Sequence, residues 1–94
     1  MQVKSCAVAG TFYPGEASQL TQEVQRYLGS ALPFSGALKA VIVPHAGYRY
    51  SGPIAGSAYA PLQPARATIR RVVLLGPSHP VGFQGLALRG ADLL

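Results

Sequence analysis

Hydrophobic positions recur with a helical period in the first third of the chain. Between residues 17 and 28 they fall at i, i+4, i+7 and i+8, so one apolar stripe is made of Leu20, Val24, Tyr27 and Leu28. Glutamine and arginine residues occupy the opposite side, and Gly29 follows as a candidate C-terminal cap. This pattern predicts an amphipathic helix over about residues 17–28.

A different pattern, continuous rather than periodic, marks three candidate strands. Aliphatic runs within residues 40–43 and 71–75 end at a proline and a glycine, and residues 85–89 form a third short candidate. Between the first two, Ser51 can cap a helix beginning near Pro53, where the N–H that proline lacks would be unpaired anyway. We expect two further prolines to end this helix, and one face to carry Ile54, Ala58 and Leu62.

Continuous apolar strands joined through a helix are typical of a right-handed βαβ unit in a parallel sheet. The sequence therefore predicts an α/β fold with a parallel or mixed sheet. Small residues in the second helix, at positions 56–58 and 60, favour close packing of that helix on the sheet.

Composition adds one expectation to this picture. Of 94 residues, 49% are hydrophobic and 12% are charged, about half of the roughly 25% expected of an ordinary soluble domain. We therefore expect the chain to be part of a longer one.

No apolar run approaches the roughly 20 residues that cross a bilayer, and no secretory signal is recognisable, which favours a cytoplasmic protein. The single cysteine, Cys6, cannot form an internal disulfide and is best interpreted as a small buried hydrophobe.

The net charge of +5 does not indicate nucleic-acid binding. Six of the eight basic residues stand alone, and only Arg70 and Arg71 are adjacent, so no basic stripe could follow a phosphate backbone. A nucleotide phosphate loop is also excluded, because Pro53 and Ile54 stand where the required lysine and hydroxyl residue would be.

Two histidines follow the predicted strands. His45 lies two residues after Val43, and His79 lies four residues after Leu75. Ligands of parallel sheets bind outside the carboxyl ends of the strands, so both imidazoles should project from one edge. At a separation of one or two strand spacings, two rings can ligate one ion. Each histidine alone is more often an ordinary polar residue than a ligand; as a pair, a shared metal site and two ordinary polar residues are equally good interpretations, and we take the metal site as the prediction.

The loop after His45 carries Tyr48, Arg49 and Tyr50. Two phenols and a guanidinium could line the mouth of a pocket and bind an acidic or aromatic ligand. Packing of these rings in the core or at its rim is an equally good interpretation.

Three blocks resemble the Memo family, whose prokaryotic members are known as AmmeMemoRadiSam system protein B. They are Ala-Gly-Thr-Phe-Tyr-Pro at 9–14, Val-Pro-His-Ala-Gly-Tyr-Arg-Tyr-Ser-Gly at 43–52 and Leu-Gly-Pro-Ser-His at 75–79. The resemblance covers essentially the whole chain and identifies residues 1–94 as the N-terminal portion of a single Memo-like domain, with the remainder absent.

The resemblance implies a fold similar to class III extradiol dioxygenases, which are non-haem iron enzymes. It also implies a cleft in which His45 and His79 are metal ligands. We expect Tyr48, Arg49, Tyr50 and Ser78 to line this cleft. A further histidine and a cysteine of the family's cleft come from later sequence, and Cys6 does not match that cysteine. Iron or copper is the implied metal, with zinc as a further candidate, and proteins with AMMECR1-like or radical-SAM domains are the implied partners.

These observations give a first hypothesis, a metal-binding protein with a redox or oxygen-dependent role whose reaction is unknown. The alternative is a non-catalytic module that binds peptides or proteins through a vestigial cleft, with Tyr48, Arg49 and Tyr50 as anchors. A metal-dependent hydrolase would need a carboxylate near His45, and none is close in sequence. The sequence does not select the substrate, the metal or the oligomeric state.

Overall fold

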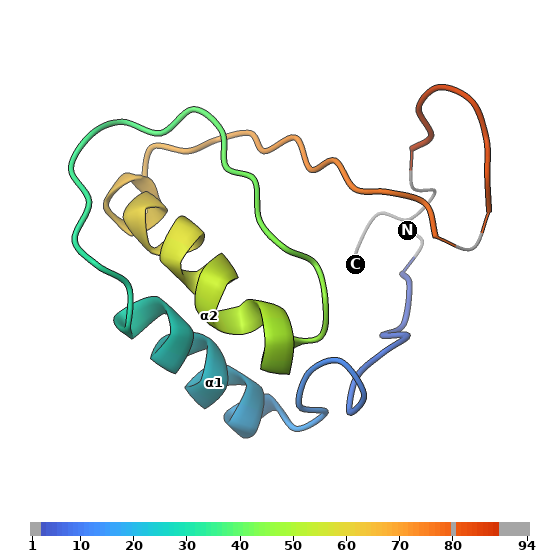
Figure 1. The fold of residues 1–94 in the computed structure, drawn as a ribbon, viewed down its shortest axis with the longest axis horizontal. Helices are drawn as coiled ribbons and strands as arrows, with labels where there is room; N and C mark the ends of the chain where they lie inside the picture. The colour runs from blue at the N-terminus through green and yellow to red at the C-terminus, as the bar shows by residue number, and fades with distance from the viewer. Residues whose placement is uncertain (1–2, 80, 89–94) are drawn as a thin grey trace.

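The computed structural model describes residues 3–79 and 81–88. Its regular elements are two α-helices and one short 3₁₀ helix, which are α1 (Ala17–Gly29), α2 (Tyr48–Tyr59) and η1 (Ala60–Ala65). Figure 1 shows α1 and α2 lying side by side, with long extended segments running away from them. Ala9 and Tyr13 form an isolated β-bridge, and no run of strand residues occurs in the described ranges.

The first helix confirms the periodic pattern. Helix α1 spans the predicted range to within one residue, and its four stripe residues are each half-buried while most other positions are exposed. The end of the helix differs from the expectation, because Gly29 is its last helical residue rather than a left-handed cap. Ser30 follows in a right-handed conformation and donates its N–H to the carbonyl of Arg26, while the carbonyl of Leu28 accepts from the N–H of Ala31.

The second helix begins five residues before the predicted Pro53. It starts at Tyr48, whose N–H donates to the carbonyl of Phe12 at 2.7 Å, and Gly47 occupies the N-cap position. Pro53 therefore lies inside the helix. The predicted apolar face is also wrong at Ile54, whose side chain is 63% exposed. The reason is that α2 packs on another helix through its smallest residues and not through its aliphatic ones.

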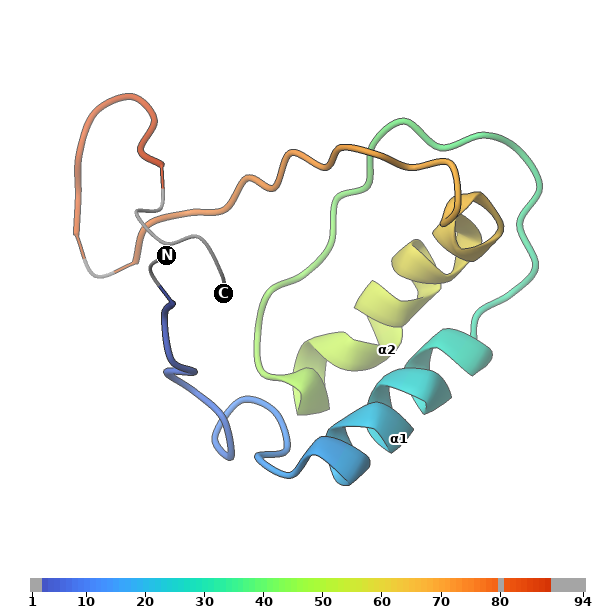
Figure 2. The same ribbon diagram turned by 180° about the vertical axis from the view of Figure 1, so that it is seen from behind.

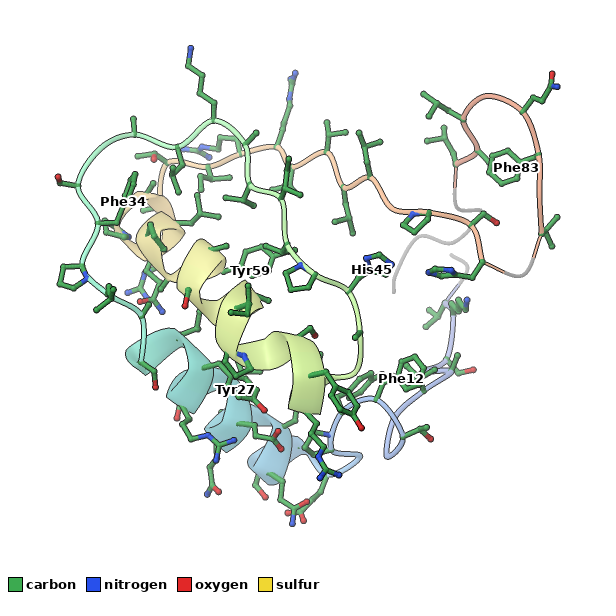
Figure 3. All side chains as sticks on the ribbon, viewed as in Figure 1. Phe12, Tyr27, Phe34, His45, Tyr59 and Phe83 are labelled. Atoms are coloured by element: carbon green, nitrogen blue, oxygen red, sulfur yellow. The ribbon has the colours of Figure 1, made fainter. Side chains whose placement is uncertain are left out.

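The contact between the helices depends on two glycines. Gly52 and Gly56 are buried on α2, one helical turn apart, and both face Tyr27 of α1. A Cβ atom added to Gly56 would lie 2.6 Å from the Tyr27 carbonyl oxygen, and one added to Gly52 would lie 2.4 Å from the Tyr27 ring. The side-chain view in Figure 3 places Tyr27 between the two helices. Only residues without a side chain permit so close an approach.

The predicted α/β fold is wrong for the described part of the chain. Residues 40–43, 71–75 and 85–88 are not strands, and no parallel sheet or βαβ unit forms; Arg89, the last residue of the third candidate, lies outside the described residues. The expected similarity to the fold of the extradiol dioxygenases is therefore also wrong for this part of the chain. In Figures 1 and 2 the segment after η1 leaves the helices as an extended chain.

The physical reason lies in what an apolar run specifies. It indicates that residues favour burial, whereas a strand also needs a neighbour to complete its hydrogen-bond ladder. Residues 72–75 have no such neighbour among the backbone hydrogen bonds of the described residues, and their side chains are 76–84% exposed. Because no neighbouring layer packs on it, this apolar segment is extended and its side chains are exposed to solvent.

The exposed segments leave the molecule open. No hydrophobic side chain among the described residues is fully buried, and the only polar one that is buried belongs to Ser51. The Cα radius of gyration is 15.0 Å, compared with roughly 12 Å for a compact domain of this length. Within the described ranges, neither helix is long and apolar enough to cross a membrane.

Candidate metal centre

The backbone that carries His45 is held from two sides. On one side, a tight loop at residues 8–13 turns through Gly10, which has a φ of +81°, and presents the Phe12 carbonyl to the first amide of α2. On the other side, Ser51 is 5% exposed, and its hydroxyl donates to the carbonyl of Ala46 at 2.8 Å. These two hydrogen bonds hold the backbone at Ala46, the residue that follows His45. Figure 3 shows His45 on the loop that leads into α2.

His79 approaches from the other end of the chain. It closes the extended segment that follows η1, and the hydroxyl of the preceding Ser78 donates to the carbonyl of Val81. This bond belongs to the turn itself, because Ser78 and Val81 are three residues apart. Ser78, which was expected to line the cleft, therefore has a local hydrogen-bond partner next to His79.

The two imidazoles meet although no sheet brings them together. Their Nε2 atoms lie 3.3 Å apart, and the ring centroids are separated by 5.3 Å with 32° between the planes. One ring can donate to the other when one Nε2 is protonated and its partner is not. This is the only side-chain hydrogen bond given for the described residues that joins distant parts of the sequence, since the two histidines are 34 positions apart.

The same separation suits a shared metal ion. His45 and His79 could both ligate one ion, because metal–nitrogen bonds to histidine of about 2.0–2.1 Å can span this Nε2 separation. Both side chains are exposed, so an ion and water can reach them. The geometry of the pair therefore fits a metal, and the role of His45 and His79 as ligands remains a prediction.

The described residues supply no third ligand at this position. No group of three or more histidine, cysteine or carboxylate side chains with metal-binding geometry occurs in the ranges that the structure describes. A protein site for zinc or non-haem iron uses at least three such ligands. The pair therefore supplies about half of a tetrahedral shell.

The remaining predicted residues lie on the first turn of α2. Tyr48 stacks against Tyr13 with ring centroids 5.5 Å apart, while the guanidinium of Arg49 lies 5.9 Å from the ring centroid of Tyr50. The structure thus pairs Tyr48 with the amino-terminal loop and leaves Arg49 and Tyr50 exposed. None of the three takes part in a hydrogen bond or ring contact with either histidine.

A contact that the sequence reasoning missed lies beside this turn. A hydrogen bond with the side chain of Cys6 raises the pKa of the Tyr13 phenol above 10.0, and burial and the charges of Cys6 and Tyr48 raise it further. Cys6 itself is exposed, which corrects its interpretation as a buried hydrophobe. The block at residues 9–14 was a signal that this loop is specific, but its spacing does not show which helix it contacts.

A groove of about 580 Å³ lies elsewhere, where the loop after α1 meets η1. Its walls include Leu28, Phe34, Pro61 and Arg66, and neither histidine lines it. The groove therefore contributes nothing to the histidine pair.

Comparison with known proteins gives one family. The sequence model of the family described as Memo-like protein matches residues 4–92. The protein MEMO1 of Danio rerio is 38% identical over 93 residues, which is 99% of this chain and 31% of that protein. The MEMO1 family protein MHO1 of Saccharomyces cerevisiae is 36% identical over 94 residues, 97% of this chain and 27% of that protein.

A third relative, the memo-1 homolog of Caenorhabditis elegans, is 39% identical over 85 residues, 90% of this chain and 24% of its own length. The chain thus spans less than a third of each of these relatives. No solved structure gives a significant match.

Proposed function

The chain belongs to the Memo family, and we propose that it binds one redox-active or divalent metal ion through His45 and His79. The observation that carries this proposal is the 3.3 Å separation of the two Nε2 atoms, which suits two ligands of a single ion. Iron or copper is the preferred metal, with zinc as a further candidate.

The residues around the pair position the ligands. The hydroxyl of Ser51 and the carbonyl of Phe12 fix the loop before α2, and the turn of Ser78 fixes the loop at His79. For both Nε2 atoms to act as ligands, both must be free of protons, so the proton shared between the rings leaves when the ion binds. The bound metal would supply Lewis-acid or one-electron chemistry.

We extend the proposal to a redox or oxygen-dependent role, because a redox-active metal such as iron or copper can supply such chemistry; the substrate and reaction stay unassigned. Partners with AMMECR1-like or radical-SAM domains belong to the same proposal. The two protein ligands leave coordination positions for water or a substrate. With so few protein ligands, the 94-residue chain should bind metal weakly.

The experiment is calorimetric titration of the chain with iron(II), copper(II) and zinc(II), in the wild type and in His45→Ala, His79→Ala and the double variant. Loss of either imidazole should weaken binding by more than the roughly 10–100-fold that loss of an outer-shell partner costs. Cys6→Ser is the matched control, because it removes an exposed metal-ligating side chain that does not contact the histidines. Equal affinity in the double variant and the wild type would refute the site.

A second function is favoured by a separate observation. Tyr50 is exposed, and the Arg49 guanidinium lies against its ring, so the first turn of α2 presents an aromatic and a cationic group together. These side chains could anchor an acidic peptide without a metal. Binding of such a peptide that survives the His45 and His79 substitutions and is lost in Arg49→Ala would favour this function.

A further inference from the structure

The ring of Tyr13 joins the amino-terminal loop to the first turn of α2. It lies against the ring of Tyr48, with centroids 5.5 Å apart and 42° between the planes. Both side chains are half-buried, whereas Arg49 and Tyr50, the next residues of the helix, are exposed. Contact between two aromatic rings stabilises an arrangement beyond what their burial alone provides. The two rings therefore connect parts of the chain that are distant in sequence.

The backbone at Tyr13 is held within its own loop. The N–H of Gly10 donates to the carbonyl of Tyr13 at 2.7 Å, and the N–H of Phe12 donates to the carbonyl of Val8 at 2.9 Å. Gly10 has a φ of +81°, a conformation that glycine adopts more readily than other residues. These local bonds fix the direction from which the Tyr13 ring reaches α2.

The same loop contacts the backbone between His45 and Tyr48. A Cβ atom added to Gly47 would lie 3.4 Å from the carbonyl oxygen of Phe12, so the two backbones pass close to each other. Figure 3 shows the loop that carries Phe12 beside the first turn of α2, and His45 on the segment that enters this turn. The Tyr13 ring therefore packs on the chain immediately after the segment that directs His45.

His45 depends on such support because its side chain is exposed. Its ring contacts that of His79 with 3.3 Å between the Nε2 atoms. A hydrogen bond of this length is already at the long end of the usual range, so a small displacement of the backbone would break it. The Ser51 hydroxyl holds the neighbouring Ala46 carbonyl from within α2, and Tyr13 is the aromatic contact that approaches from outside the helix.

We propose that Tyr13 is a positioning residue for His45, whose ring, packed on Tyr48, holds the loop in the conformation in which the two imidazoles meet. Tyr13 touches neither histidine and acts through the backbone of the loop. The ring carries this role, because it makes the contact with Tyr48, whereas the hydroxyl bonds to the side chain of Cys6. An effect of Tyr13 on metal affinity rests on the proposed function, but its effect on the meeting of the imidazoles does not.

Three variants test this role in the metal-free chain. Tyr13→Ala removes the ring, and Tyr13→Phe keeps the ring without the hydroxyl. Phe34→Ala is the matched control, because it removes an exposed ring from the groove that neither histidine lines. Nuclear Overhauser effects between the imidazoles of His45 and His79 measure whether the rings meet. We expect these effects in the wild type, in Tyr13→Phe and in Phe34→Ala, and their loss in Tyr13→Ala.

Metal affinity gives a second measurement. In calorimetric titration with zinc(II), Tyr13→Ala should bind about 3–10-fold more weakly than the wild type, which corresponds to the loss of one aromatic contact. Tyr13→Phe should restore the wild-type affinity. Tyr48→Ala should weaken binding to a similar extent, and the double variant of Tyr13 and Tyr48 should be no weaker than either single one, because both substitutions remove the same contact.

Unchanged Overhauser effects in Tyr13→Ala, their loss in Tyr13→Phe, or their absence from the wild type would each overturn the proposal. Circular dichroism should show the helices in all three variants, since neither Tyr13 nor Phe34 lies in α1, α2 or η1. Loss of the helices in Tyr13→Ala would show that the ring supports the fold and not His45, which would also overturn it. Failure of the proposed function is a separate result, namely equal metal affinity in the wild type and in the double variant of His45 and His79.

Discussion

The helix pair and the extended region, residues 70–79 and 81–88, use apolar residues in opposite ways. In the helix pair, glycines rather than large side chains make the closest contact, and Tyr27 covers Gly52 and Gly56. In the extended region, the large aliphatic side chains of residues 72–75 are exposed and bury no part of the molecule. The difference shows that hydrophobicity alone does not build a core, since a complementary surface must also be present.

Three changes test how far the helix pair depends on close fit, and the largest effect is expected at Gly56. In Gly56→Ala the new Cβ would lie 2.6 Å from the carbonyl oxygen of Tyr27, which is backbone and cannot rotate away. The helices must separate, and we expect a loss of about 1–3 kcal/mol in the free energy of unfolding. Urea denaturation followed by circular dichroism measures it.

Gly29→Ala is the matched control, because no atom lies within 4 Å of the Cβ position at Gly29 in α1. There alanine should stabilise the helix by up to about 1 kcal/mol through its better propensity. Equal effects of the two substitutions would show that the helices do not depend on the glycine contact.

A smaller effect is expected at Ser51, which connects the helix pair to the candidate metal centre. Ser51→Ala removes a buried hydroxyl that bonds to the carbonyls of Ala46 and Gly47 at 2.8 and 3.2 Å. We expect a loss of about 1 kcal/mol in the free energy of unfolding, with faster amide exchange in the loop that carries His45. Ser57→Ala removes an exposed hydroxyl bonded to the Pro53 carbonyl and should leave that loop unchanged. Unaltered exchange in Ser51→Ala would contradict the proposed support.

The smallest effect concerns pH. The hydrogen bond from the Tyr27 phenol to Glu23, 2.8 Å long, raises the pKa of Tyr27 above 10.0, and burial of the ring adds to it. The folded state therefore retains a proton that the unfolded chain loses at about pH 10. This contribution to stability is complete below pH 10.0 and disappears as pH rises through the higher pKa of the folded state.

Nuclear magnetic resonance titration of the Tyr27 ring measures this pKa directly. Glu23→Gln should lower it toward 10.0, whereas Glu16→Gln, whose carboxylate accepts from Ser18, should not. A Tyr27 pKa that is the same in Glu23→Gln and in the wild type would show that the hydrogen bond is not its cause.

Sequence patterns predicted the parts of the fold that depend on neighbouring residues. The stripe from Leu20 to Leu28 is sufficient for α1, because a helix completes its backbone bonds internally. The start of α2 was misplaced at Pro53 because its actual start depends on the carbonyl of Phe12, which is distant in sequence. The sheet prediction was wrong since residues 72–75 encode a preference for burial without encoding a neighbour.

The two histidines were expected to be neighbours because a parallel sheet was expected, and the described residues form no sheet. His45 and His79 were expected to meet at the edge of a sheet, and they lie 3.3 Å apart without one. Each histidine follows an apolar run and a proline- and glycine-containing turn, and this position in the sequence was sufficient to predict the pair. Whether they ligate a metal stays a prediction.

The bond between Phe12 and Tyr48 makes the beginning of α2 a property of the amino-terminal loop. The first N–H of a helix has no acceptor within the helix, and here the acceptor is a carbonyl of the amino-terminal loop. The first turn of α2 is therefore fully hydrogen-bonded only when that loop is in contact with it. Any alteration upstream, at Gly10 for example, should be transmitted through this amide to the orientation of the His45 ring. The loop at residues 8–13 should therefore affect the candidate site, although none of its side chains forms a hydrogen bond with either histidine.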